Sequence, residues 1–344
     1  MSSMVGATGN QLPAVQAAYD FLDSGGSAVG AVLSGFFVEA GAHAGVLLGP
    51  LVVMVAGIGS GVRVFDGRLR QPGLGTKRPR GFTQGAGIPM GARLAVPQAI
   101  AAAVVAHAYE RTGSFAEVLK RGIRQARQAG AEARAEVLES VQSQGARFLS
   151  SPQIARPLLH VAGVSEGGLL TPADLASVSS LDFTARVHPE LQDWAIVPWS
   201  SDESAWSNRI AVDASTEVLG DTTSTMLLCA VDARGIFAGI SYQNVSHGVP
   251  IEELELEAPM SAVPVRRGIP RVSPGTCLPA PAPFAIQTSR GVAVSIVGDS
   301  RLDFLTSTAI LNPQLRIQRQ PDTRRVTVNE QLTELREFAN PPRG

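Results

Sequence analysis

The sequence is poor in several residue types that mark particular classes of protein. Of its 344 residues only 5% are aromatic, only Lys77 and Lys120 are lysine, and the formal net charge is −1. A near-neutral chain gives no electrostatic reason to bind nucleic acid or an anionic membrane surface. We therefore expect no nucleic acid and no membrane among its partners.

Cysteine and histidine are scarce as well. The two cysteines, Cys229 and Cys277, have neither metal-ligand spacing nor the pattern of a disulfide framework. Cys229 lies in an apolar run, which favours a small buried side chain. The five histidines are scattered without ligand spacing, and no Gly-x4-Gly-Lys phosphate loop is present. We expect neither a metal nor an organic cofactor.

Long apolar runs are also missing. The most apolar stretch, residues 46–58, is interrupted by Gly49 and Pro50 and is too short to span a bilayer. The first residues lack the basic segment and apolar core of a signal peptide. These features predict a cytoplasmic protein.

The first half of the chain has the periodicity of helices. Residues 11–23 predict a helix that ends at the two glycines that follow, and Ser27 can cap a second helix that runs to about residue 38. Further segments predict a hairpin at 51–65, helices at 96–109, 115–123 and 131–144, and a short helix that begins at the capping pattern of residues 171–174.

The second half has the pattern of buried strands. Apolar runs at 226–231 and 236–242 flank a turn, and the runs at 284–287 and 292–297 repeat this design. Strands that are apolar on both faces need cover on both faces. With the helices, this pattern predicts an α/β (α+β) fold with four layers, an αββα sandwich. Residues 179–224 are expected to be a connector with short strands, and residues 248–275 a long surface loop.

Short motifs then carry a resemblance to a known family. Residues 167–175, GGLLTPADL, match the motif Gly-Gly-Leu-Leu-Thr-x-x-Asp-Leu, the most specific of the set. Residues 25–31, GGSAVGA, are similar to Gly-Gly-Asn-Ala-Val-Asp-Ala, and residues 66–72, DGRLRQP, to Asp-Phe-Arg-Glu-x-Ala-Pro. In their order along the chain, these motifs resemble those of the γ-glutamyltranspeptidase family of N-terminal-nucleophile hydrolases.

The resemblance implies one domain over residues 1–344, with a large-subunit-like part at 1–224 and a small-subunit-like part at 225–344. Residues 225–232, TMLLCAVD, fall where the family has Thr-Thr-His-x-Ser-Val-Val-Asp, which gives Thr225 the position of the catalytic nucleophile. The family's chemistry implies self-cleavage before Thr225, whose freed α-amine then serves as its base. Thr222 and Thr223 are the alternatives if the match is shifted.

Three further residues are candidates for substrate binding. The resemblance makes Arg68 the anchor for a substrate carboxylate, which a guanidinium holds through two parallel hydrogen bonds. Ser241 and Asn244 lie close to Gln243, which falls where the family has a Thr that supports the nucleophile. Arg68 can instead pair with Asp66 or Asp174, and Thr225 can be an ordinary residue at the start of a strand.

The sequence departs from the family at several site positions. Pro279 and Ala280 replace paired serines that hold the substrate carboxylate, and neither side chain donates a hydrogen bond. Arg301 and Leu302 replace the glycines that help to build the oxyanion hole. Two interpretations follow. One is an amide hydrolase or acyltransferase that acts on a small amide or amino-acid derivative other than ordinary γ-glutamyl compounds. For such an enzyme a homodimer is the expected assembly. The other is an uncleaved, non-catalytic relative that binds a ligand or a partner protein.

Overall fold

A six-stranded antiparallel sheet organises the chain. Its strand order is β1-β7-β8-β2-β3-β4. The strands are β1 (Gly6–Gly9), β2 (Leu51–Ala56), β3 (Val62–Gly67), β4 (Leu181–Thr184), β7 (Thr222–Val231) and β8 (Phe237–Ser246). The computed structural model describes residues 5–9, 11–58, 61–77, 81–83, 86–110, 112–184, 186–187, 194–197, 222–268, 270–278, 284–287, 296–297, 319–320 and 323–324.

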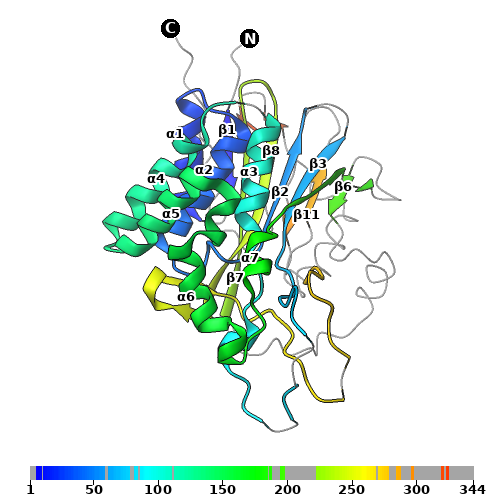
Figure 1. Ribbon diagram of the computed structural model, residues 1–344. Helices are drawn as coiled ribbons and strands as arrows, with labels where there is room; N and C mark the ends of the chain where they lie inside the picture. The colour runs from blue at the N-terminus through cyan, green and yellow to red at the C-terminus, as the bar shows by residue number, and fades with distance from the viewer. Residues whose placement is uncertain are drawn as a thin grey trace.

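Helices cover one face of this sheet (Figure 1). α2 (Ala28–Ala42) is the central one, and every residue from Ala28 to Gly41 is buried. It can pack closely because it carries glycine where its neighbours approach: a Cβ at Gly41 would lie 2.2 Å from the carbonyl oxygen of Gly122 on α4. The other helices are α1 (Leu12–Asp23), α3 (Ala99–Glu110), α4 (Phe115–Gln128), α5 (Glu132–Gln144), α6 (Pro152–Ala162) and α7 (Pro172–Ala176).

Alternate residues of the strands form the helix-side core. Leu51, Val53 and Val55 of β2 belong to the large apolar cluster that includes α2, and so do Leu228 and Ile240 of β7 and β8. This is the period of two that places alternate side chains of a strand on opposite faces. Residues of the other parity are buried too, among them Met54, Val64, Cys229 and Phe237. Both faces of the sheet are therefore covered, as the solid apolar runs predicted.

Smaller sheets complete the described secondary structure. One has the order β12-β11-β6-β5, and in it β11 and β12 pair as an antiparallel hairpin, as predicted. Its strands are β5 (Arg186–Val187), β6 (Trp194–Val197), β11 (Phe284–Gln287) and β12 (Ile296–Val297). A two-stranded sheet joins β13 (Arg319–Gln320) to β14 (Thr323–Arg324). The fold class of helices combined with antiparallel sheet is confirmed, while the four-layer arrangement stays a prediction.

The prediction of a long surface loop at 248–275 is wrong for the first part of that range. Residues 249–258 form β9 (Val249–Ile251), a 3-10 turn η4 (Glu252–Leu254) and β10 (Leu256–Ala258). The apolar side chains of Val249, Ile251 and Leu256 are buried in the main core. The glutamates between them hid this pattern in the sequence. The other 3-10 turns are η1 (Met90–Arg93), η2 (Gly145–Ser150) and η3 (Val164–Glu166). Within the described ranges, the helices are too short or too polar to cross a bilayer.

Candidate active site

The strand register brings the predicted site residues to one end of the six-stranded sheet. Gly67, the last residue of β3, pairs with Leu51, which pairs with Tyr242 of β8, which in turn pairs with Met226 of β7. Arg68 follows Gly67, and Thr225 precedes Met226. Residues more than 150 positions apart in the sequence therefore lie at the same end of four neighbouring strands.

Thr225 lies inside β7 rather than at its first residue. The strand begins at Thr222, and every residue from there to Val231 has a partner on β8. Ser224 pairs with Asn244, and Thr225 pairs with Gln243. The peptide bond that the resemblance marks for self-cleavage is thus part of a regular antiparallel ladder. Thr222 and Thr223, the alternative nucleophiles, begin this strand.

Ser241 and Asn244 are three positions apart on β8 and therefore lie on opposite faces of the strand. Ser241 is buried, opposite Leu227 on one side and Val52 on the other. Asn244 is half-buried and pairs with Ser224. Gln243, the ladder partner of Thr225, shares a face with Ser241 and is also buried. Ser241 and Gln243 therefore form a polar pair on one face, which Asn244 does not join.

Arg68 forms a buried ion pair with Asp66. Its Nε donates to both carboxylate oxygens at 3.0 and 2.9 Å, its Nη2 donates to Oδ2 at 2.7 Å, and its backbone N–H donates to Oδ1 at 2.9 Å. Burial alone would lower the pKa of Arg68, but the hydrogen bonds and charge of Asp66 outweigh it, so the pKa is raised. The side chain is fixed beside the sheet, and its role in binding a substrate carboxylate stays a prediction.

A thiol lies close to this ion pair. The backbone of Cys277 forms an isolated bridge with Arg70, two residues beyond Arg68. Burial raises the pKa of the Cys277 thiol, and the positive charge of Arg68 opposes this shift in part. The thiol is therefore held in its neutral form at pH 7.

The GGLLTPADL motif holds the chain that follows Arg68. Asp174 and Thr171 form a capping box at the start of α7. The Asp174 carboxylate also accepts hydrogen bonds from the backbone N–H groups of Gly73 at 2.8 Å and Leu74 at 3.0 Å. Any residue larger than glycine would clash at position 168, because a Cβ there would lie 2.0 Å from the carbonyl oxygen of Ala162. The motif that carries most of the resemblance thus positions the loop beside the candidate site.

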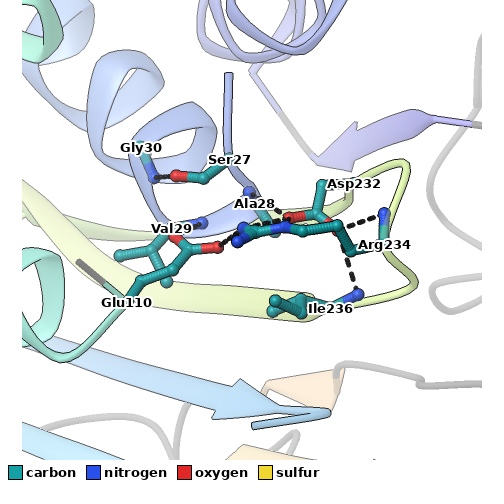
Figure 2. Close-up of polar contacts among 8 residues, drawn as sticks. All are labelled: Ser27, Ala28, Val29, Gly30, Glu110, Asp232, Arg234 and Ile236. Atoms are coloured by element: carbon teal, nitrogen blue, oxygen red, sulfur yellow. Dashed lines mark hydrogen bonds and ion pairs between the residues drawn. The ribbon is translucent and has the colours of Figure 1, made fainter. Parts of the chain in front are cut away.

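A second network lies at the opposite end of the β7–β8 hairpin, where Figure 2 shows Asp232, Arg234 and Glu110. Asp232 Oδ1 accepts hydrogen bonds from the backbone N–H groups of Arg234 at 2.9 Å and Ile236 at 3.1 Å, and its Oδ2 accepts from Arg234 Nη2 at 2.6 Å. Arg234 also pairs with Glu110, whose other oxygen accepts from the N–H of Val29 at 3.1 Å.

This network holds the turn of the hairpin against the first turn of α2. A carboxylate there is stabilised by the exposed N–H groups and the positive end of the helix dipole. Burial nevertheless raises the pKa of Glu110, because the charge of Arg234 offsets only part of the desolvation. The last residue of the TMLLCAVD segment, Asp232, is therefore a structural residue of the hairpin.

Other predicted positions lie outside the described residues. These are Pro279, Ala280, Arg301 and Leu302, which fall at the serine and glycine positions of the family. Among the described residues, no group of three or more His, Cys, Asp or Glu side chains could hold a metal ion.

Comparison with known proteins finds solved structures with a similar fold. No protein-family model and no curated protein matches the sequence. A cephalosporin acylase from Bacillus halodurans matches over 85% of this chain and 76% of its own, with 13% identity and a TM-score of 0.63. A structure of LmbA2991 matches over 94% of this chain and 83% of its own, with 15% identity and a TM-score of 0.61.

The γ-glutamyltranspeptidase of Helicobacter pylori is also among the matching structures, over 61% of this chain and 76% of its own, with 18% identity and a TM-score of 0.44. LmbA2991 and the cephalosporin acylase, with TM-scores of 0.61 and 0.63, share the fold of this chain. The chain has the N-terminal-nucleophile hydrolase fold that the resemblance predicted.

Proposed function

We propose that this chain is a divergent amide-bond hydrolase or acyltransferase whose nucleophile is Thr225. The observation that carries the proposal is the fold shared with an enzyme named as an acylase. The position of Thr225 on β7 supports it. Thr225 lies on β7, the second strand of the sheet, next to the strand that carries Ser241 and at the sheet end where Arg68 leaves β3.

The proposed chemistry begins with the chain's own backbone. The Thr225 hydroxyl oxygen attacks the carbonyl carbon of Ser224, the C–N bond breaks, and the acyl group passes to oxygen as an ester. Water hydrolyses this ester, which leaves a carboxylate on Ser224 and a free α-amine on Thr225. That amine then accepts the hydroxyl proton during turnover, as in other enzymes with an amino-terminal nucleophile.

In turnover the Thr225 oxygen attacks the amide carbonyl of a substrate. The C–N bond of the substrate breaks, its amine leaves with a proton, and an acyl-threonine ester remains. Water then releases the acid, or an acceptor amine takes the acyl group. Arg68 is proposed to bind a carboxylate of the substrate, although Asp66 already accepts from its Nε and Nη2.

Ordinary γ-glutamyl compounds are not the proposed substrates. The family's paired serines and oxyanion-hole glycines are replaced here by Pro279, Ala280, Arg301 and Leu302. Loss of one oxyanion donor alone costs about 10²- to 10³-fold in rate. A small amide or amino-acid derivative with a different acyl group is the proposed substrate class.

The decisive test is the intact mass of purified protein, measured fresh and after long incubation. We expect two fragments, residues 1–224 and 225–344, because the mechanism requires a free amine on Thr225. Thr225→Ala should stay at full length, while Thr223→Ala, the matched control, should still be cleaved. A wild-type mass that stays at full length would refute the proposal.

One observation favours the second candidate function, an uncleaved protein that binds a ligand or partner. The backbone on both sides of the Ser224–Thr225 bond is paired with β8 in a regular ladder. Self-cleavage is helped by strain at the scissile bond, and a regular ladder provides none. The same mass measurement separates the two candidates.

A further inference from the structure

Two segments of the sequence contain no carboxylate at all. Between Asp66 and Glu110 the chain has six Arg or Lys residues and no Asp or Glu. Between Glu257 and Asp299 it has four Arg residues and again no Asp or Glu. Because the formal charge of the whole chain is −1, the rest of the sequence must be strongly acidic.

The described residues of these segments at 68–77, 81–83, 86–95, 259–268 and 270–278 are joined into one body, which we call the basic lobe. The side-chain amide of Gln71 donates to the carbonyl of Val263 and accepts from its N–H, both at 2.9 Å. Phe82 donates to the carbonyl of Val265 at 2.8 Å and accepts from the N–H of Arg267 at 3.0 Å. Figure 1 shows both segments, cyan and gold, at the lower end of the molecule.

The exposed cations of the basic lobe are not neutralised by other described residues. Lys77, Arg266 and Arg267 are exposed, and none of them forms an ion pair with a described carboxylate. Among the described acids outside the lobe, Asp66 pairs with the buried Arg68, and Asp174 is buried and accepts hydrogen bonds from the backbone, so neither neutralises the exposed cations. By contrast Arg121 on α4 is paired with Asp20 at 2.6 Å. Uncompensated charge of one sign attracts ligands of the other sign.

The rest of the lobe surface narrows the class of ligand. Met90 and Val263 are large apolar side chains that are 48% and 46% exposed. The described residues of the lobe have no α-helix or strand that could enter a nucleic-acid groove, and Phe82 is their sole aromatic residue on which a base could stack. Exposed arginine beside exposed Met and Val is typical of protein-binding surfaces, where Arg and Met are enriched.

We propose that the basic lobe is a docking surface for an acidic polypeptide segment that also carries apolar side chains. Guanidinium groups bind carboxylates through paired hydrogen bonds, and the apolar side chains of the segment cover Met90 and Val263. Arg68 begins the lobe, so the docked segment lies at the same end of the sheet as the candidate active site. The proposal does not depend on Thr225 as a nucleophile.

Fluorescence anisotropy with a short labelled peptide rich in Glu, Asp and Leu tests this directly. We expect wild-type protein to bind it and the apparent affinity to fall as salt is raised. Arg266→Glu/Arg267→Glu should weaken binding by at least about tenfold. Lys120→Glu/Arg124→Glu, which reverses two exposed cations of α4, is the matched control and should change it by less than about twofold.

Lys77→Glu, on the other segment of the lobe, should also weaken peptide binding. The melting temperature of each variant tests whether it is folded. The proposal is overturned if the peptide does not bind at low salt or if the lobe and α4 variants weaken binding equally. It is also overturned if an oligodeoxythymidine of equal charge binds more tightly than the peptide.

Discussion

At the scale of single residues, Glu39 is an ionisable group that lies buried in the apolar core. It lies in α2 with its side chain 2% exposed, and its Oε1 has no hydrogen-bond partner among the described residues. The nearby Tyr242 hydroxyl is likewise buried without one, and its pKa is raised by burial and by the charge of Glu39. His43 Nε2 lies 3.7 Å from the other Glu39 oxygen. Burial raises the pKa of Glu39 from 4.5 to about 7.

This shift makes the free energy of unfolding depend on pH. Because the folded state binds the Glu39 proton more tightly than the unfolded state, stability is lost as pH rises from about 4.5 to about 7, by on the order of 3 kcal/mol. Glu39→Gln should remove this loss, so the variant should be more stable than wild type at pH 8 and similar at pH 4. Urea denaturation across this pH range measures it.

The exposed Glu117 provides the control for this prediction. Its side chain is 62% exposed and pairs with Lys120 in water, so Glu117→Gln should leave the pH dependence of stability as it is in wild type. Equal pH slopes for Glu39→Gln and wild type would show that Glu39 is not the group responsible.

At the scale of elements, the attachment of the β7–β8 hairpin to α2 depends on one buried carboxylate. Asp232 is 1% exposed and accepts from the backbone N–H groups of Arg234, Ile236 and, at 3.4 Å, Ala28 at the start of α2, and also from the side chain of Arg234. Asp232→Ala leaves these buried donors without an acceptor, which should lower the free energy of unfolding by about 2–4 kcal/mol. Asp182→Ala removes a half-exposed partner of Arg63 and should cost less than about 1 kcal/mol.

Denaturant titration of both variants measures this difference. Hydrogen exchange of the turn and of the first residues of α2 should rise in Asp232→Ala, because both lose the contact that holds them together. Similar losses of stability in the two variants would contradict the structural role given to this network.

At the scale of the whole molecule, the net charge conceals a strong separation of charge. The chain is near neutral, with a pI of about 6.5, yet the basic lobe carries exposed cations without neighbouring acids. A protein with such a patch binds an oppositely charged surface through the patch and not through its mean charge. We expect wild-type protein to be retained on a cation-exchange column at pH 7.5, above its pI.

Arg266→Glu/Arg267→Glu should abolish this retention, whereas Lys120→Glu/Arg124→Glu should change it little, although both variants have the same net charge. Elution of the wild type in the unbound fraction would show that the lobe does not present its cations together.

Features that depend on residues close together in the chain could be predicted from the sequence alone. The cap at Ser27, the capping box of Thr171 and Asp174, and the two-residue ion pair of Arg68 with Asp66 all join groups a few positions apart. The hairpins were predictable for the same reason, because a turn sets the register of the strands beside it. The family motifs predicted the N-terminal-nucleophile hydrolase fold, whereas hydrophobic periodicity alone did not distinguish it from other folds of helices and sheet.

Features that depend on contacts between distant segments became visible only in the folded chain. Burial of Glu39 requires the sheet and α4 on either side of α2, and the basic lobe requires residue 71 to meet residue 263. The net charge is a sum over the whole chain, and a local pattern describes only near neighbours in sequence. Neither gives the position of a charge in space. The physical reason is that burial and electrostatic potential are set by neighbours in space, and for these residues most neighbours are far away in sequence.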